Sequence, residues 1–363
     1  MNKEVDDFGL KELGWKDFFQ QQITEQESDL MPARVSRQDI NRFHLLSAHG
    51  DLMGSLPGRL HTEATSKAEL PTVGDWVLTS PADQNDPSSV VIERNLKRFS
   101  KFSRKEAGDR YDEQVVAANI DTVFIVSGLD GNFNVNRIER YLVLGWSSGA
   151  NPVLVLNKAD LCPDLEEKLE SLHSVAVGVP IFAVSAHSGE GLNQLKPYIT
   201  SSQTVAFLGS SGVGKSTIIN SLLGYERFLT AQTREIDGKG RHTTTFREMC
   251  KMDSGGLIID TPGMREIQIW MDEASLARSF SDVEDFSLLC RFNDCAHLSE
   301  PGCAVQSAIA DGSLETSRLE SFRKFQKELT HLQEKRDLAA RTEGKKERKK
   351  FAKTIRNRPI KRD

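Results

Sequence analysis

The strongest constraint on how this chain can fold is one stretch, Gly209-Ser210-Ser211-Gly212-Val213-Gly214-Lys215-Ser216, which matches the pattern G-x-x-x-x-G-K-[ST] in full. An apolar run at 205–208 predicts a buried strand before it, and residues 216–223 predict a helix after it. Glycines let successive backbone N–H groups point at one anion, while the lysine reaches the outer phosphates and the serine hydroxyl can bind Mg²⁺. The stretch therefore predicts a loop that binds nucleotide phosphates.

Buried strands alternate with helices from residue 121 onward. The predicted strands lie at 122–126, 152–156, 181–184, 205–208 and 257–259. This alternation is typical of a doubly wound α/β domain, in which ligands bind in loops at the carboxyl ends of the parallel strands. Motifs that directly follow these strands are therefore candidates for the ligand site.

The motif Asn157-Lys158-Ala159-Asp160 follows the second strand and predicts recognition of guanine. The Asp160 carboxylate can accept from the ring N–H and the exocyclic amine of guanine, whereas adenine has an acceptor in place of that ring donor. Asn157 and the stem of Lys158 can then bond and pack against the base. After the next strand, Ser185-Ala186-His187 offers backbone N–H groups for the guanine oxygen. A helix-capping turn would explain the first motif alone, but not three motifs at three strand ends.

Another strand end carries Asp260-Thr261-Pro262-Gly263. Its carboxylate can hold Mg²⁺ through water while the Gly263 N–H meets the γ-phosphate. The polar, glycine-rich residues 238–245 predict a switch that is ordered when triphosphate is bound. One of its threonines, taken here as Thr244, is expected to bind Mg²⁺ together with Ser216.

The catalytic prediction starts from a missing glutamine. Many GTPases place a water-orienting glutamine just after the D-x-x-G motif, where this chain has Met264. Hydrolysis by the protein alone should therefore be slow. His242, beside the switch threonines, is the candidate that orients water or accepts its proton, and a solvated loop histidine is the alternative.

The order of these motifs differs from that of an ordinary GTPase. Base recognition normally follows the phosphate loop along the chain, but here residues 157–160 and 185–187 precede Gly209. This order predicts a circularly permuted GTPase domain. It is more specific than any single motif.

The cysteines predict a metal site near the C-terminal end. The chain has five, and Cys290, Cys295, His297 and Cys303 form the arrangement C-x₄-C-x-H-x₅-C. Three thiolates and one imidazole make a closed tetrahedral set for one structural Zn²⁺, with buried free cysteines as the alternative. Cys162 and Cys250 are interpreted as packing residues.

Short alternating runs in the N-terminal part predict a small antiparallel barrel of the OB type. The predicted strands lie at 33–35, 43–46, 58–60, 76–78 and 89–92. Barrels of this kind often bind oligonucleotides. Four arginines could line such a face or simply be its solvated side, namely Arg34, Arg37, Arg42 and Arg59. The basic residues 97–105 are either an RNA-contacting linker or a solvated connection.

The charge distribution is uneven. The chain has a net charge of −5, yet residues 341–363 hold eleven Lys or Arg against three Asp or Glu, a net charge of +8. Such a tail is expected to contact RNA phosphates, with a solvated charge run as the alternative. No apolar run of membrane-spanning length and no signal-peptide layout occur, which predicts a cytoplasmic protein without a membrane partner.

Barrel, permuted GTPase and C-x₄-C-x-H-x₅-C module, in this order, closely resemble the RsgA (YjeQ/EngC) family of ribosome small-subunit-dependent GTPases. The resemblance implies a bacterial factor that binds the immature small ribosomal subunit and its rRNA, assists late maturation and leaves after GTP hydrolysis. It also implies nucleotide binding by Asn157, Lys158, Asp160 and all residues from Gly209 to Thr217, with zinc on the four C-terminal ligands.

The expected organisation is multidomain, and the protein is expected to be a monomer. The predicted parts are an N-terminal extension (1–30), an OB-fold-like barrel (31–105), the circularly permuted α/β GTPase domain (111–271), a helical zinc-binding domain (272–340) and a basic tail (341–363). Two other functions remain open. One is a P-loop ATPase or kinase, which would leave the guanine motif without a purpose. The other is a structural RNA-binding factor whose nucleotide site is regulatory and does not hydrolyse GTP.

Overall fold

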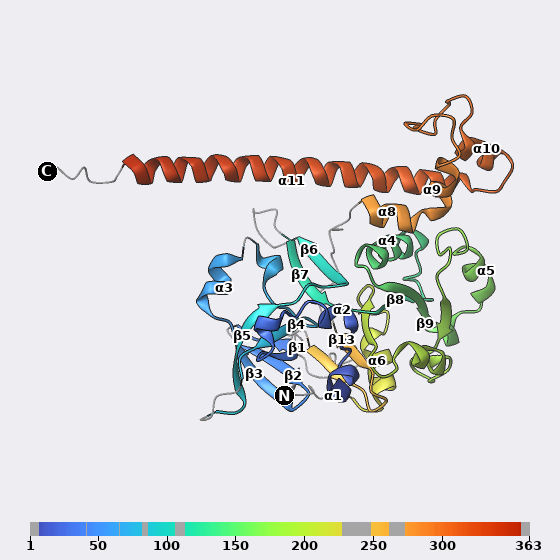
Figure 1. Cartoon of the computed structure of the whole chain (residues 1–363). Helices are drawn as coiled ribbons and strands as arrows, with labels where there is room; N and C mark the ends of the chain where they lie inside the picture. The colour runs from blue at the N-terminus through green and yellow to red at the C-terminus, as the bar shows by residue number, and fades with distance from the viewer. Residues whose placement is uncertain are drawn as a thin grey trace, which may run out of the picture. The chain divides into compact units, whose positions relative to one another are not determined.

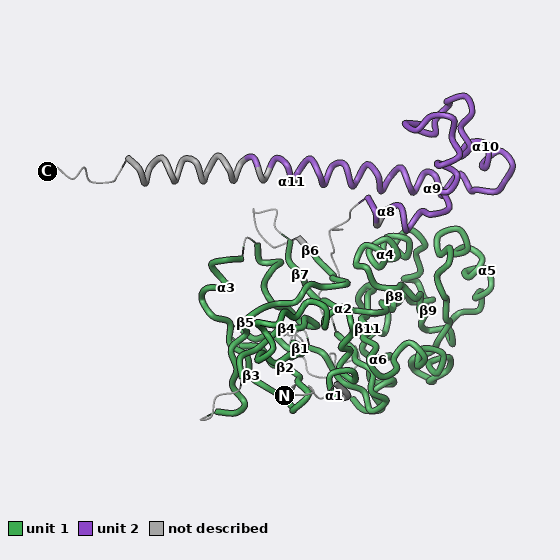
Figure 2. Tube along the Cα trace, viewed as in Figure 1, with its two compact units in different colours: residues 1–104, 113–270 green, residues 105–112, 271–363 purple. Residues whose placement is uncertain are grey.

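The computed structural model describes residues 7–40, 42–64, 66–81, 86–105, 113–226, 248–260 and 273–356. The chain forms two compact units, one of residues 1–104 with 113–270 and one of residues 105–112 with 271–363 (Figure 2). Figure 1 labels most of the helices and strands of the two units.

The N-terminal part of the first unit is a closed barrel of five strands. They are β1 (Met31–Gln38), β2 (Phe43–Ser47), β3 (Gly50–Ser55), β4 (Trp76–Thr79) and β5 (Ser89–Asn95). The strands follow the order β1-β2-β3-β5-β4, and β4 pairs again with β1. Only β3 and β5 are parallel; the other barrel pairs are antiparallel. Buried Val35, Leu45, Val77 and Ile92 fill the interior. The predicted OB-like barrel is confirmed.

One predicted barrel strand is wrong. Residues 58–60 belong to the helix α3 (Gly58–Glu63), and the third strand is β3, which was not predicted from the sequence. Ser47 pairs with Gly50, so only two residues turn the chain before the next strand begins. Pro57 precedes the helix, and proline cannot donate to a strand ladder. Residues 49–51 are typical of turns, but Gly50 and Asp51 already belong to the second strand of a hairpin.

The residues before the barrel pack into the first unit. They form α1 (Asp7–Glu12), α2 (Asp17–Gln20) and the 3₁₀ turn η1 (Glu25–Glu27). Trp15 and Phe19 are buried against Trp76 of β4, with the two tryptophan ring centroids 4.7 Å apart. Because Val77 points into the barrel interior and its neighbours Trp76 and Leu78 point to the other side of β4, this segment packs on the outer face of the barrel.

A six-stranded α/β sheet occupies the rest of the first unit. Its strands are β8 (Thr122–Gly128), β9 (Asn151–Asn157), β10 (Ile181–Val184), β11 (Thr204–Leu208), β12 (Glu248–Lys251) and β13 (Leu257–Asp260). The order is β10-β9-β8-β11-β13-β12; all neighbours are parallel except β12 and β13. The five predicted parallel strands are confirmed. At its other edge β12 pairs with β1 through Arg37 and Glu248, so barrel and α/β sheet form one continuous sheet.

Helices and short turns connect the strands of the α/β sheet. They are α4 (Val135–Ser147), η3 (Ala159–Leu161), α5 (Leu165–Glu170), η4 (Leu192–Tyr198) and α6 (Lys215–Leu223). Phe124, Phe207 and Ile218 lie in the core between the sheet and these elements. Asn134 caps α4, because its side-chain oxygen accepts the Arg137 N–H.

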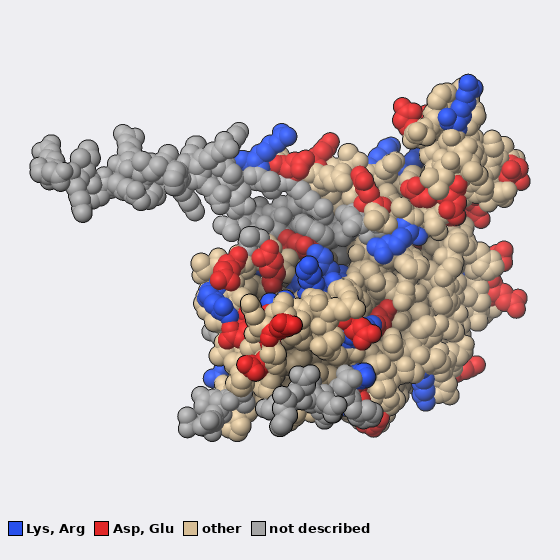
Figure 3. Space-filling view, in the orientation of Figure 1, with Lys and Arg blue, Asp and Glu red and all other residues tan. Residues whose placement is uncertain are grey.

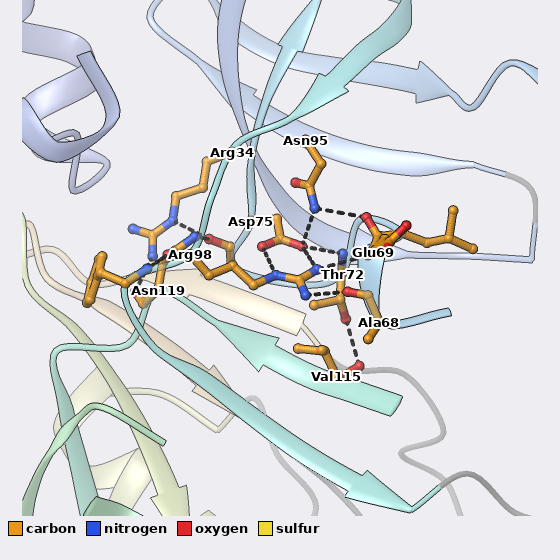
Figure 4. A network of polar contacts seen from close by, with 12 residues as sticks. Arg34, Ala68, Glu69, Thr72, Asp75, Asn95, Arg98, Val115 and Asn119 are labelled. Carbon is orange, nitrogen blue, oxygen red and sulfur yellow. Dashed lines mark hydrogen bonds and ion pairs between the residues drawn. The ribbon is translucent and has the colours of Figure 1, made fainter. Parts of the chain in front are cut away.

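Buried ionic groups join the barrel to the start of the α/β part (Figure 4). Arg34 of β1 is 1% exposed and donates to the carbonyls of Leu13, Gly74 and Asn119. Burial lowers the pKa of Arg34 to about 10, so the guanidinium remains charged at neutral pH. The expectation that Arg34 lines a solvent-facing RNA surface is therefore wrong.

The basic linker is also used internally. Arg98 donates to both oxygens of the fully buried Asp75 carboxylate, at 2.7 and 2.6 Å (Figure 4). Lys101 pairs with Glu113 across the hairpin of β6 (Lys101–Lys105) and β7 (Glu113–Ala118). Both of these basic side chains are held by acidic partners in structural contacts, so this linker is not simply solvated.

The second unit is helical. It contains α8 (Glu273–Ser279), α9 (Ser281–Ser287), α10 (Ala304–Ala310) and the 41-residue α11 (Thr316–Arg356). Phe280 packs against Phe322 and Phe325 of α11, and Arg318 pairs with Asp282. The predicted helical module is confirmed. Among the described helices, none is both long and apolar enough to cross a membrane.

Candidate nucleotide site and metal centre

The phosphate-loop motif forms a tight turn between β11 and α6. Gly209 and Gly214 have φ angles of +153° and +95°, in the region that favours glycine. A Cβ at Gly209 would lie 2.2 Å from the Val126 carbonyl oxygen. The Lys215 Nζ reaches back over the turn to the carbonyls of Gly209 and Ser210, both at 2.7 Å. The loop thus curls around its own lysine.

Asn157 ties three loops together. Its side chain is 2% exposed; Nδ2 donates to the Val213 carbonyl at 2.8 Å, and Oδ1 accepts the Ala186 N–H at 2.9 Å. The amide therefore holds the phosphate loop and the loop after β10 in register with the end of β9. In the loop after β10, the hydroxyl of the buried Ser185 accepts the Ser188 N–H at 3.2 Å and so stabilises the turn of that loop.

The other two residues of the guanine motif face outward from this junction. Lys158 has a left-handed backbone, with φ +68°, and its Nζ lies 2.6 Å from Asp130 Oδ2. Asp160 follows in the turn η3 and is exposed to solvent. Its carboxylate is thus presented at the surface, beside the lysine stem and the tied loops.

The remaining predicted nucleotide residues are partly described. Ser211 and Gly212 are exposed, while Ser216 and Thr217 are half-buried in the first turn of α6. Asp260 is the last residue of β13, the parallel neighbour of β11. Thr244 and His242 lie outside the described residues, as does Gly263.

All described motifs meet at one edge of the sheet. Residues 128–130, 157–160, 185–188, 209–215 and 260 follow or end the parallel strands β8, β9, β10, β11 and β13. Parallel strands present their carboxyl ends at the same edge, which is where doubly wound sheets bind ligands. The arrangement can hold a phosphorylated ligand at α6 and a base above η3.

The four predicted metal ligands converge in the second unit. One ligand atom from each of Cys290, Cys295, His297 and Cys303 lies within 4.8 Å of the others. His297 Nδ1 is 3.6 Å from the Cys290 Sγ and 3.5 Å from the Cys303 Sγ. This donor set, three sulfurs and one imidazole nitrogen, fits a tetrahedral metal ion.

Neighbouring groups orient the metal ligands. His297 Nε2 lies 3.0 Å from Ser287 Oγ, which leaves Nδ1 to face the sulfurs. Burial, and then the nearby Arg323 charge, lower the pKa of His297 and so favour the neutral imidazole that a metal requires. The Glu300 carboxylate accepts N–H groups of Ala296, Leu298 and Ser299, which fixes the loop that carries the histidine.

Two residues that shape these sites were not predicted from the sequence. Asp130 contacts Lys158 and comes just after β8, at the same sheet edge as the predicted motifs. Its position after a predicted strand was a usable signal. Ser287 contacts His297 from the end of α9, and no sequence pattern pointed to it.

The protein is a multidomain P-loop protein with a permuted α/β domain. A closed barrel precedes this domain, and a cysteine-rich helical module follows it. A family model described as RsgA GTPase matches residues 95–270. The "Small ribosomal subunit biogenesis GTPase RsgA 2" of Lactiplantibacillus plantarum is 44% identical over 312 residues, which cover 86% of this chain and 87% of the relative. The corresponding protein of Opitutus terrae is 44% identical over 327 residues, 88% of this chain and 89% of the relative.

Solved structures agree with this likeness. The crystal structure of YjeQ from Thermotoga maritima is 28% identical, has a TM-score of 0.63 and covers 83% of this chain and 99% of that one. YloQ, described as a circularly permuted GTPase, has the same fold with a TM-score of 0.62 at 21% identity, over 85% of this chain and 98% of that one. The chain belongs to the RsgA GTPase family.

Proposed function

We propose that this protein hydrolyses GTP to GDP and phosphate as a late assembly factor of the small (30S) ribosomal subunit. The observation that carries the proposal is the junction at Asn157, which fixes the phosphate loop and the guanine motif in one rigid corner. Relatives of similar length carry the name small ribosomal subunit biogenesis GTPase. The protein would bind rRNA of the immature subunit and leave after hydrolysis.

In this proposal GTP is bound with Mg²⁺. The guanine base lies against Lys158 and Asp160, and the phosphates lie in the loop of residues 209–217. Ser216 and Thr244 bind the Mg²⁺, Asp260 holds it through water, and the Gly263 N–H meets the γ-phosphate. The position of Asp260 at the end of the strand next to the phosphate loop supports its part in this assignment.

The metal of the second unit is proposed to be one structural Zn²⁺. Three thiolates with one imidazole favour zinc over the harder Mg²⁺ and Ca²⁺, which prefer oxygen ligands. Four protein ligands leave no open position for a substrate, so the ion would hold the loop between α9 and α10 together.

RNA contact is proposed for the barrel and the basic tail. Arg37 and Arg59 pair with Asp39 and Glu93, whereas Arg42 is an exposed residue of the turn between β1 and β2. On the face drawn in Figure 3, acidic side chains are interspersed with basic ones on the barrel. The strongest basic surplus is therefore the tail, 341–363, with its net charge of +8. We expect a monomer that works in the cytoplasm.

The decisive experiment is GTP hydrolysis measured with and without purified small subunits. Turnover should be slow alone and strongly stimulated by the subunits, because Met264 cannot orient water. Subunit binding should depend on the nucleotide. Equal binding with GTP, GDP or neither, together with no hydrolysis, would instead favour an RNA-binding factor whose nucleotide site is regulatory.

The same assay tests His242 as the catalytic residue. His242→Ala should retain GTP and subunit binding but lose most of the stimulated rate, because general acid–base or water-positioning groups contribute factors of roughly 10² to 10⁴. Lys215→Ala should instead lose nucleotide binding first. Full stimulated turnover by His242→Ala would show that His242 is a solvated loop residue without a catalytic role. The attacking water would then be oriented by rRNA or by backbone groups.

Guanine specificity is proposed to depend on Asp160. Asp160→Asn replaces an acceptor oxygen with a donor amide, which leaves a guanine N–H unpaired at a cost of about 1–3 kcal/mol. Affinity for GTP should fall by roughly 5- to 150-fold at that cost. Affinity for xanthosine triphosphate should rise, because the carbonyl oxygen of its ring can accept a hydrogen bond from the asparagine N–H. Competition titrations with both nucleotides measure the change, and unaltered GTP affinity would contradict the assignment.

A further inference from the structure

The side chain of Lys158 is held by a residue outside the guanine motif. Lys158 Nζ lies 2.6 Å from Asp130 Oδ2, and the two side chains are 28% and 27% exposed. Asp130 stands 28 residues earlier, in the loop that follows the neighbouring strand β8. The ammonium group is thus drawn sideways along the sheet edge, and the four-carbon stem spans the gap between two strand ends.

Asp130 is itself fixed in place. Its other carboxylate oxygen accepts the Asn132 N–H at 3.0 Å, and its carbonyl accepts the Phe133 N–H at 2.9 Å. A Cβ at Gly128 would lie 2.7 Å from Asp130 Oδ1, so the glycine at the end of β8 leaves the room that this carboxylate occupies. The acid is therefore part of a built turn and not a freely rotating surface group.

The backbones of the two loops are also joined. The Leu129 N–H donates to the Asn157 carbonyl at 2.8 Å, directly before Lys158. Lys158 adopts φ +68°, a left-handed conformation that costs a side-chain-bearing residue roughly 1–2 kcal/mol. This conformation ends the extended backbone of β9 at Lys158, and the ammonium group of the lysine pairs with the Asp130 carboxylate.

The charge of Asp130 is maintained at neutral pH. Partial burial acts against the ionised form, but hydrogen bonds from Lys158 and the Asn132 N–H outweigh it and lower the pKa of Asp130. The ion pair is consequently complete under the conditions in which nucleotide would bind.

We propose that Asp130 is a positioning residue for nucleotide binding, which sets the Lys158 stem as the platform for the guanine base. This inference rests on the proposed function, because it assumes a guanine nucleotide at the edge of β8 and β9. Asp130 does not need to contact the nucleotide. It acts by fixing the lysine before the base arrives, so less side-chain freedom is lost on binding.

The test compares nucleotide affinities of variants of the full chain with a fluorescent methylanthraniloyl GDP and the matching GTP. Asp130→Asn keeps the shape but removes the charge, and it should weaken both nucleotides by the same factor of about five, the effect expected for a partly exposed ion pair. Equal loss for both is expected because the base side of the site is common to them. Asp164→Asn is the matched control, because Asp164 pairs with the neighbouring Lys168 at 3.0 Å.

A second background shows whether Asp130 acts through Lys158. Lys158→Met keeps an apolar stem but has no charge, so Asp130→Asn should cause no additional loss in that background. An additional fivefold loss there would overturn the proposal, as would full affinity of the Asp130→Asn single variant. A wild-type protein that binds neither nucleotide would refute the proposed function itself, which separates the two failures.

Discussion

Gly214→Ala is expected to abolish useful nucleotide binding while the chain stays folded. Gly214 has φ +95°, and an added Cβ would lie 2.2 Å from Asn157 Nδ2. The amide would have to move, which breaks its bond to Val213 in a buried place. A left-handed alanine costs about 1–2 kcal/mol and a lost buried hydrogen bond about 1–3 kcal/mol. The loop relieves these costs by leaving the geometry that binds phosphate, and restoring that geometry should lower nucleotide affinity by roughly 30-fold or more.

Titration with fluorescent GDP measures this effect, and Gly224→Ala is its matched control. Gly224 ends the same helix, α6, with φ +80°, but nothing lies within 4 Å of an added Cβ. The control variant therefore has the same kind of backbone strain without the collision. Similar nucleotide affinities in the two variants would show that the contact with Asn157 does not shape the site.

The meeting of these motifs at one edge of the sheet could be predicted from the sequence because the motifs are local. Gly209 to Ser216 specify their own turn, and Asn157 and Asp160 follow directly on a continuous apolar run. Since parallel strands end at one edge, predicting the strands also predicted that Ser185, Asp260 and the phosphate loop would meet there. No long-range contact had to be known in advance.

The barrel face was harder to predict, because contacts with segments far away along the chain decide which of its arginines are buried and which are exposed. The Arg34 guanidinium is surrounded by carbonyls 21, 40 and 85 residues away along the chain. In an alternating strand pattern such a residue cannot be told from a solvated one. The Asp130 contact to Lys158 spans 28 residues and escaped prediction for the same reason.

The third barrel strand shows a different limit. Gly50 and Asp51 are common turn residues, and the more apolar run 58–60 lies close by. The actual turn takes only two residues, so Gly50 already pairs with Ser47. Hairpin register depends on which cross-strand partners can form, and that information lies in β2 and β3 together.

Cys295→Ser is expected to remove the metal and loosen the loop between α9 and α10. A serine hydroxyl is a much weaker zinc ligand than a thiolate, and structural zinc contributes about 10–16 kcal/mol of apparent binding free energy in small zinc domains. Bound zinc, measured by elemental analysis, should fall from one per chain to near zero. The residues 288–303 should then become the preferred site of limited proteolysis, and association with small subunits should weaken.

The separation of the two units makes this loss selective. The metal ligands belong to the second unit, whereas the phosphate loop and Asn157 belong to the first. GDP affinity of Cys295→Ser should therefore stay within about twofold of wild type, since sites that belong to separate compact units and share no partners behave independently. Cys162→Ser, in the first unit, is the control that should keep its zinc. Zinc that stays at one per chain in Cys295→Ser would show that this cysteine is not a ligand. Lost GDP binding would show that the metal site supports more than its own module.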